Sequence, residues 1–128
     1  KVRYGIGNVI TLKKQYSFDE IKKMLLKNLN ISQDKIASYN FSNGRKIKKI
    51  IVLPGSGSSD VWKVIVGKPD LLITSDLKHN QIVDLSDINI SYINATHYGL
   101  EKVFIEYFLL FLSKKFKGKV LVYNDTNF

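Results

Sequence analysis

The sequence contains no cysteine, which excludes disulfide bonds and zinc sites built on thiolate ligands. This absence agrees with a reducing compartment, and we expect the protein to be cytoplasmic. Long apolar runs are also missing. The longest spans residues 103–112, is interrupted by Glu106, and falls far short of the roughly 20 residues that a membrane span needs. We therefore expect no membrane-spanning segment, and the residues after Lys1 lack the apolar stretch of a signal peptide.

Acidic residues are scarce as well: 11 stand against 20 lysines and arginines, which gives a net charge of +9. Such a balance favours anionic partners. Arg3 and Arg45 are the two arginines, whereas proteins that read base edges rely on arginine for two-pronged hydrogen bonds. We therefore interpret the lysines as a solvated surface. Nucleic-acid binding through them is kept as a minor alternative, which predicts a steep salt dependence.

The length of 128 residues and the 45% hydrophobic content predict one domain, residues 1–128, with a substantial core. Strands and helices are expected to alternate as β-α-β-β-α-β-α-β-α-β. This order predicts an α/β fold, a layered and largely parallel sheet with helices packed on it. The expected strands are residues 4–10, 35–41, 46–53, 70–74, 88–93 and 119–123, and the expected helices are residues 18–29, 60–66, 81–85 and 97–116. The apolar run of strand 70–74 fits a strand that is buried on both faces.

Two of the expected helices carry clear local signals. Ser17 and Glu20 form a capping-box pattern at the start of helix 18–29, whose apolar residues recur at helical spacing. The helix 97–116 is apolar on most sides, so we expect it to be central in the fold and to end at Gly118.

Polar residues gather at three junctions, each directly after an apolar strand. They are the Gly/Ser loop 54–60, the segment 75–80, and the start of helix 97–116. The carboxyl ends of parallel strands meet at one edge of a sheet, so we expect the three junctions to converge there. The backbone N–H groups and hydroxyls of Ser56, Gly57 and Ser58 are suited to an anion beside a helix start, although a structural turn explains the loop equally well.

His97 and Glu101 are four residues apart, so a helix places both side chains on one face. An imidazole beside a carboxylate is half of a typical divalent-metal site, which needs further ligands. The simpler alternative is a histidine at a helix start and an unrelated exposed glutamate. Asp76, Lys78 and His79 are candidate groups around the pair or the substrate.

Three motifs in this order resemble those of the GTP cyclohydrolase type 2 homologues, also called NGG-interacting-factor-3-like proteins. The motifs are Leu53-Pro54-Gly55-Ser56-Gly57-Ser58-Ser59, Leu72-Ile73-Thr74-Ser75-Asp76-Leu77-Lys78 and Asn94-Ala95-Thr96-His97-Tyr98-Gly99-Leu100-Glu101. Gly5-Ile6-Gly7 and Asn124-Asp125-Thr126-Asn127 resemble the family's flanking motifs. Departures include Ser75 in place of a frequent glycine and Asn80 in place of a histidine.

The resemblance implies a two-metal site in a two-lobed protein that forms a toroidal hexamer. It implies that His97 and Glu101 are metal ligands (zinc, iron or manganese) and that the remaining ligands belong to an N-terminal half. This sequence has two histidines and no His-His pair, so it resembles the C-terminal half alone. The implied chemistry is hydrolysis of a nucleotide-like or phosphorylated substrate, with no catalytic residue assigned. The alternative is a non-catalytic interaction or scaffold protein with a structural or vestigial metal.

Overall fold

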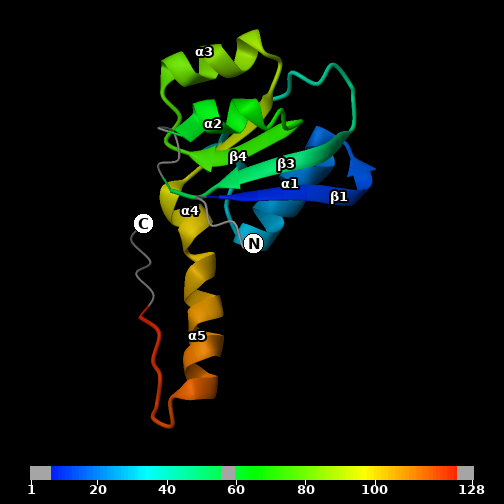
Figure 1. The fold of residues 1–128 in the computed structure, drawn as a ribbon. Helices are drawn as coiled ribbons and strands as arrows, with labels where there is room; N and C mark the ends of the chain where they lie inside the picture. Colours follow the sequence, from blue (N-terminus) through cyan, green and yellow to red (C-terminus); the bar gives the residue numbers. More distant parts are fainter. Residues whose placement is uncertain (1–6, 56–59, 124–128) are drawn as a thin grey trace.

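The computed structural model describes residues 7–55 and 60–123 (Figure 1). Its strands are β1 (Asn8–Tyr16), β2 (Ala37–Tyr39), β3 (Ile47–Leu53), β4 (Leu71–Ser75) and β5 (Ser91–Ala95). Its helices are α1 (Phe18–Leu29), the 3₁₀ turn η1 (Gln33–Lys35), α2 (Val61–Val66), α3 (His79–Asp87), α4 (His97–Glu101) and α5 (Val103–Lys115). No helix of this described part is long and apolar enough to cross a bilayer.

The five strands form one mixed sheet in the order β1-β3-β4-β5-β2. The three central strands are parallel, but β1 pairs antiparallel with β3, and β2 pairs antiparallel with β5. The α/β class is confirmed, whereas a largely parallel sheet describes only its centre. The outermost strands are short or solvent-exposed over most of their length, and antiparallel pairing tolerates an exposed face better than parallel pairing does.

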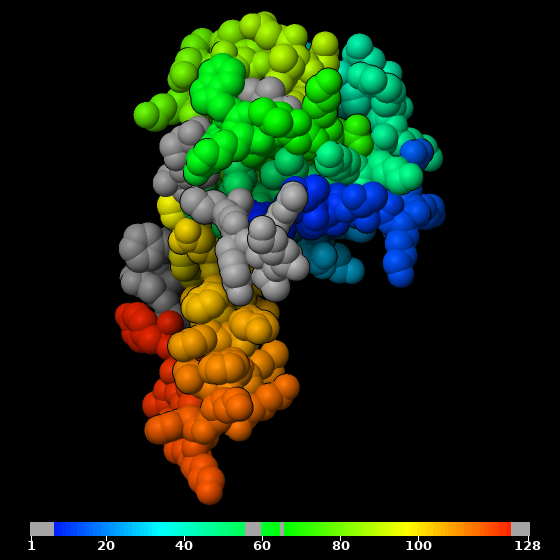
Figure 2. Space-filling view, in the orientation of Figure 1, coloured from blue at the N-terminus to red at the C-terminus, as the bar shows by residue number. Residues whose placement is uncertain are grey.

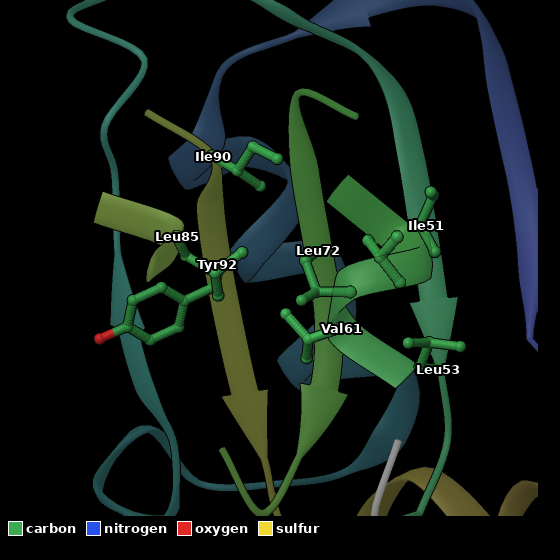
Figure 3. Packing of buried hydrophobic residues seen from close by; sticks show 8 residues of the cluster. Ile51, Leu53, Val61, Leu72, Leu85, Ile90 and Tyr92 are labelled. Atoms are coloured by element: carbon green, nitrogen blue, oxygen red, sulfur yellow. The ribbon is translucent and has the colours of Figure 1, made fainter. Parts of the chain in front are cut away.

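Alternation along the central strands creates a core on each side of the sheet. Leu72 and Tyr92 point to the side covered by α2 and α3, where Val61 and Leu85 pack against them (Figure 3). Ile73 and its neighbours point to the opposite side, which α1 covers. The expected burial of strand 70–74 on both faces is confirmed, since every residue of β4 is buried.

The start of α1 follows its sequence signal. The Ser17 hydroxyl accepts a hydrogen bond from the Glu20 backbone N–H (3.2 Å), and the Glu20 carboxylate accepts one from the Ser17 backbone N–H (2.7 Å). The helix ends at Asn30, whose φ of 49° places it in the left-handed region. Phe18, Ile21 and Leu29 are buried, as the helical spacing predicted.

Several element boundaries differ from expectation. The strand expected at 35–41 is limited to β2, because Lys35 lies in the 3₁₀ turn η1. The strand expected at 88–93 begins only at Ser91, because Asn89 adopts a left-handed turn with φ of 56°. The weak helix expected at 81–85 is the longer α3. β1 extends to Tyr16, six residues beyond the expected strand end, and the start of that expected strand lies outside the described residues.

The helix expected at 97–116 is two helices. The Ile105 backbone N–H bonds to the Lys102 carbonyl at 3.0 Å, a three-residue step that separates α4 from α5. Helix α5 ends at Lys115 because the next residue, Phe116, has extended backbone angles, so the expectation that Gly118 ends the helix is wrong.

The expectation that this helix is central is also wrong. α5 projects away from the sheet and contains no buried residue, although it is rich in phenylalanine and leucine (Figures 1 and 2). The expected strand 119–123 does not form. That segment runs back along α5 instead of along the sheet, and Val120, Leu121 and Val122 line a hollow shared with the helix.

Candidate functional site

The carboxyl ends of the three parallel strands lie together along one side of the sheet, as expected. β3 leads to Pro54 and Gly55, β4 to Asp76, and β5 through Thr96 into α4. Gly55, Asp76, His97 and Glu101 are brought together at this edge. The convergence predicted from strand order is therefore confirmed for the described part of the junctions.

His97 contacts a carboxylate through each of its ring nitrogens. Nε2 lies 3.0 Å from Glu101 Oε1, one helical turn further along the chain, and Nδ1 lies 2.6 Å from Asp76 Oδ2. About half of each side chain is exposed: 47% for His97, 48% for Asp76 and 52% for Glu101. The cluster is thus open to small solutes and ions.

The local sequence explains why α4 begins where it does. The Thr96 hydroxyl accepts a hydrogen bond from the Gly99 N–H (3.0 Å), which caps the helix so that His97 is its first residue. Gly99 is required because a Cβ there would lie 2.3 Å from Ile31 Cδ1 and 2.6 Å from the Thr96 hydroxyl. Helix α4 therefore presents His97 and Glu101 to Gly55 and Asp76.

Gly55 lies directly against the side chains of His97 and Glu101. Its φ is +71°, and a Cβ built on it would lie 2.7 Å from Glu101 Oε1 and 3.4 Å from His97 Nε2. The Gly55 carbonyl accepts a hydrogen bond of 2.6 Å from the buried Ser75 hydroxyl, which ties the end of β3 to the end of β4. Only a residue without a side chain leaves the space that the pair occupies.

Asp76 is held in an uncommon backbone conformation, with φ of 57°. The next residue is fixed to β5, since the Leu77 N–H donates to the Asn94 side-chain oxygen at 3.3 Å. This turn aims the Asp76 carboxylate at His97 Nδ1. The hydrogen bond to Asp76, reinforced by the nearby charge of Glu101, raises the pKa of His97 above its ordinary value.

The remaining predicted residues are not part of this cluster. Lys78 precedes α3, and its backbone N–H donates to the Gln81 side chain (2.8 Å), while His79 is the exposed first residue of that helix. Within the described residues, no hydrogen bond or ion pair connects either to His97 or Glu101. Ser56, Gly57 and Ser58 lie outside the described residues.

Two residues of the cluster were absent from the predicted site. Gly55 and Ser75 belong to motifs that the sequence displays, but their roles depend on contacts across 20 to 46 positions of chain. A usable signal existed for Gly55, because a Pro-Gly pair directly after a buried strand favours a turn with positive φ. No such signal exists for Ser75, which reads as an ordinary polar strand end.

A hollow of about 600 Å³ lies beside the cluster, between Pro54 and the junction of α4 and α5. Glu101 lines it together with mainly apolar side chains, among them Tyr98, Leu100 and Phe104. A mostly apolar hollow with a few polar groups at its rim is the usual form of a small-molecule site. Among residues 7–55 and 60–123, however, no cluster of three or more histidine and carboxylate side chains is arranged to hold a metal ion.

The sequence of this chain matches a known protein family. The family model Duf34/NIF3 (NGG1p interacting factor 3) matches residues 1–127. A GTP cyclohydrolase 1 type 2 homolog of Staphylococcus epidermidis is 28% identical over 96 residues, which cover 75% of this chain and 25% of that protein. A homolog of the same name from Staphylococcus aureus is 24% identical over 96 residues, with the same shares covered.

Solved structures share the fold. A protein named ybgI, of unknown function, superposes with a TM-score of 0.83 at 15% identity, covering 95% of this chain and 48% of that one. Reduced HcgD from Methanocaldococcus jannaschii gives a TM-score of 0.67 at 25% identity, covering 86% and 43%. The chain thus matches about a quarter of the curated relatives' length and about half of these structures. With a match over nearly its whole length, the chain belongs to the Duf34/NIF3 family.

Proposed function

We propose that His97 and Glu101 bind a divalent metal ion as part of a dinuclear site in a metal-dependent hydrolase. The observation that carries the proposal is the 3.0 Å approach of His97 Nε2 to Glu101 Oε1 over a glycine, with Nδ1 engaged by Asp76. Two ligands bound at 2.0–2.2 Å to one ion lie about 3 Å apart when the angle at the ion is near 90°. The two atoms therefore share an ion with little rearrangement.

Asp76 adds the feature that separates a metal-binding histidine from an ordinary surface one. A ligating histidine usually donates its other ring N–H to a carboxylate, which fixes the tautomer and raises the basicity of the ligating nitrogen. Asp76 occupies that position at Nδ1, 2.6 Å away, and leaves Nε2 on the side of Glu101. In this proposal Asp76 positions the ligand and does not itself bind the ion.

The donor set fits a part of a metal site. It supplies two ligands, and within the described residues no third histidine or carboxylate is arranged to bind the same ion, since Asp76 contacts His97 on its other ring nitrogen. The proposal therefore includes further ligands from a part of the polypeptide outside this sequence, with this chain acting as the C-terminal half. When bound, the ions would polarise the scissile group and activate a water molecule. The hollow beside Glu101 is the proposed place for a nucleotide-like or phosphorylated substrate.

The test of metal binding is the metal content of the full protein, in which the proposed remaining ligands are present, measured by mass spectrometry after purification. The double variant His97→Ala with Glu101→Ala is expected to lose bound metal. The matched control is His79→Ala with Glu106→Ala, which removes one exposed imidazole and one exposed carboxylate elsewhere. Equal metal content in the two double variants would contradict the proposal.

Hydrolysis needs its own test, since metal binding is compatible with a non-catalytic role. Nucleotides and cyclic phosphoesters are incubated with the metal-loaded protein, and products are followed by chromatography. The proposal predicts turnover that disappears in the His97→Ala, Glu101→Ala variant. Full metal occupancy without turnover of any compound would instead favour an interaction or scaffold protein with a structural metal.

The exposed surface of α5 favours this second candidate and also self-association. Phe104, Tyr107, Leu110 and Phe111 are between 49% and 68% exposed, and a helix that is apolar on all sides is normally covered. We propose that the protein forms a homo-oligomer in the cytoplasm, with α5 contributing to the interface. Sedimentation of the wild type and of the Phe104→Glu, Phe111→Glu variant tests this, and identical masses would contradict it.

A further inference from the structure

A second hollow lies at the opposite edge of the sheet, where the three parallel strands begin. Its volume is about 430 Å³, within the range of small-molecule sites. The loop before β3, the loop before β4 and the loop before β5 form its walls. It is separated from His97 and Glu101 by the length of the strands, so it is independent of the site proposed above.

The walls of this hollow carry an excess of positive charge. Arg45, Lys46 and Lys68 line it together with a single carboxylate, Asp70. Asp70 already accepts hydrogen bonds of 2.9 and 2.8 Å from two successive backbone N–H groups of β3, so its charge is engaged in holding the loops together. Within the described part of the chain, none of the three cations forms an ion pair. The charges of Arg45 and Lys68 are therefore available to a ligand, whereas the charge of Lys46 also acts on the Glu20 carboxylate and helps to lower its pKa.

Ser42 gives an independent indication of a ligand. The residue is only 7% exposed and lines the hollow, yet its hydroxyl has no hydrogen-bond partner among the described residues. The Ser42 main chain is firmly held: its N–H donates to the Asn40 side chain (3.0 Å), and its carbonyl accepts from the Arg45 backbone (2.9 Å). A buried hydroxyl without a partner is rare and unfavourable, because it has lost its hydrogen bonds to water.

The loop that carries Ser42 and Arg45 is fixed before any ligand arrives. The Phe41 N–H donates to the Ser91 hydroxyl (3.0 Å) at the start of β5, and that hydroxyl also bonds to the Asn40 side chain (3.1 Å). The Arg45 side chain is held through Nε, which donates to the Ser42 carbonyl at 3.3 Å. A site assembled in advance loses less entropy when it binds.

We propose that this hollow binds a small phosphate monoester. Arg45, Lys46 and Lys68 supply the charge that a dianion requires, and the Ser42 hydroxyl supplies one more donor to a phosphate oxygen once its side chain turns toward the hollow. Ile88, which is 43% exposed and lines the same hollow, gives an apolar surface for the organic part of the ligand. The backbone of a long nucleic acid would contact the exposed cations but not the buried Ser42 hydroxyl, so a small molecule fits this hollow better.

The probe is adenosine monophosphate, with adenosine as the neutral comparison, and binding is followed by amide chemical shifts and calorimetry. We expect one saturable site, shifts concentrated in residues 40–46, 67–70 and 88–90, and at least 10-fold weaker binding of adenosine. Replacing Arg45→Gln together with Lys68→Asn removes two charge-assisted hydrogen bonds and should weaken binding ~10- to 100-fold. Asparagine suits position 68 because Lys68 has a φ of 43°.

Three comparisons make the result decisive. The charge-matched variant Lys23→Gln, Lys27→Gln on exposed positions of α1 should bind within about 2-fold of the wild type, since neither lysine lines the hollow. Ser42→Ala should melt no lower than the wild type and bind ~5- to 10-fold more weakly, because it removes an unpaired hydroxyl and one ligand bond. The His97→Ala, Glu101→Ala variant should bind as the wild type does, so a failure of the metal proposal leaves this one untouched.

Two outcomes would overturn the proposal. One is an absence of shifts in the three loops at millimolar adenosine monophosphate. The other is binding that the Lys23→Gln, Lys27→Gln variant loses as strongly as the Arg45→Gln, Lys68→Asn variant, with tighter binding of a single-stranded oligonucleotide. That second result would indicate a diffuse lysine surface for nucleic acid.

Discussion

Replacing Gly55 by alanine tests whether the close pair at the sheet edge is what binds metal. The new Cβ would lie 2.7 Å from Glu101 Oε1, whereas an ordinary contact starts near 3.4 Å, so the carboxylate must move by about 0.7 Å. Coordination distances tolerate changes of only about 0.2 Å. Because Glu101 is half exposed, its carboxylate is expected to swing into solvent at little cost in folding free energy.

Gly44 offers a matched control for the backbone. Its φ of +82° is similar to that of Gly55 (+71°), but a Cβ there would meet nothing within 4 Å. Both Gly→Ala changes place alanine in the left-handed region, which costs ~1–2 kcal/mol of stability. We expect the two variants to lose similar stability in urea unfolding, but only Gly55→Ala to lose zinc affinity, by at least 10-fold in a calorimetric titration. Equal zinc affinities in the two variants would refute the assignment of Glu101 as a ligand.

Four further predictions concern single features of the chain. In the proposed half-site this chain alone supplies two ligands, so it should bind zinc only weakly; tight stoichiometric binding in calorimetry would contradict the half-site. In the metal-free protein, Asp76→Asn should lower the pKa of His97 measured by NMR, because the hydrogen bond to the Asp76 carboxylate is the main cause of its elevation. Ser17→Ala should destabilise the chain by about 1 kcal/mol through the lost cap of α1. Bonding to Ser17 also lowers the pKa of Glu20, so its stabilising contribution exists above its unfolded pKa and disappears as the pH falls through the folded one, which acid unfolding of Glu20→Gln would test.

The sequence was sufficient for those parts of the fold that local physics decides. The Ser17–Glu20 box predicted the start of α1, and the apolar run 70–74 predicted a strand buried on both faces. Strand order and the positions of polar residues after strands predicted that Asp76 and His97 would share one edge of the sheet. Each of these inferences rests on neighbours within a few residues or on the geometry that parallel strands share.

Features that depend on distant partners could not be predicted. Nothing near Lys119 to Tyr123 indicates that this segment lies along α5 rather than beside an outer strand of the sheet, and hydrophobicity alone cannot say whether α5 points into the fold or away from it. The antiparallel pairing of β1 and β2 likewise depends on where those strands lie in the sheet. The hydrogen bond of Ser75 to Gly55 spans 20 positions and has no sequence pattern of its own.

The position of α5 has a consequence for how the stability of this chain should be measured. The described part of the chain buries no residue of α5, and under the proposed self-association part of the folding free energy would come from contact with a second copy. By mass action, the melting temperature should then rise with protein concentration. For such a chain, a free energy of unfolding has meaning only at a stated protein concentration, and dilution favours the unfolded state.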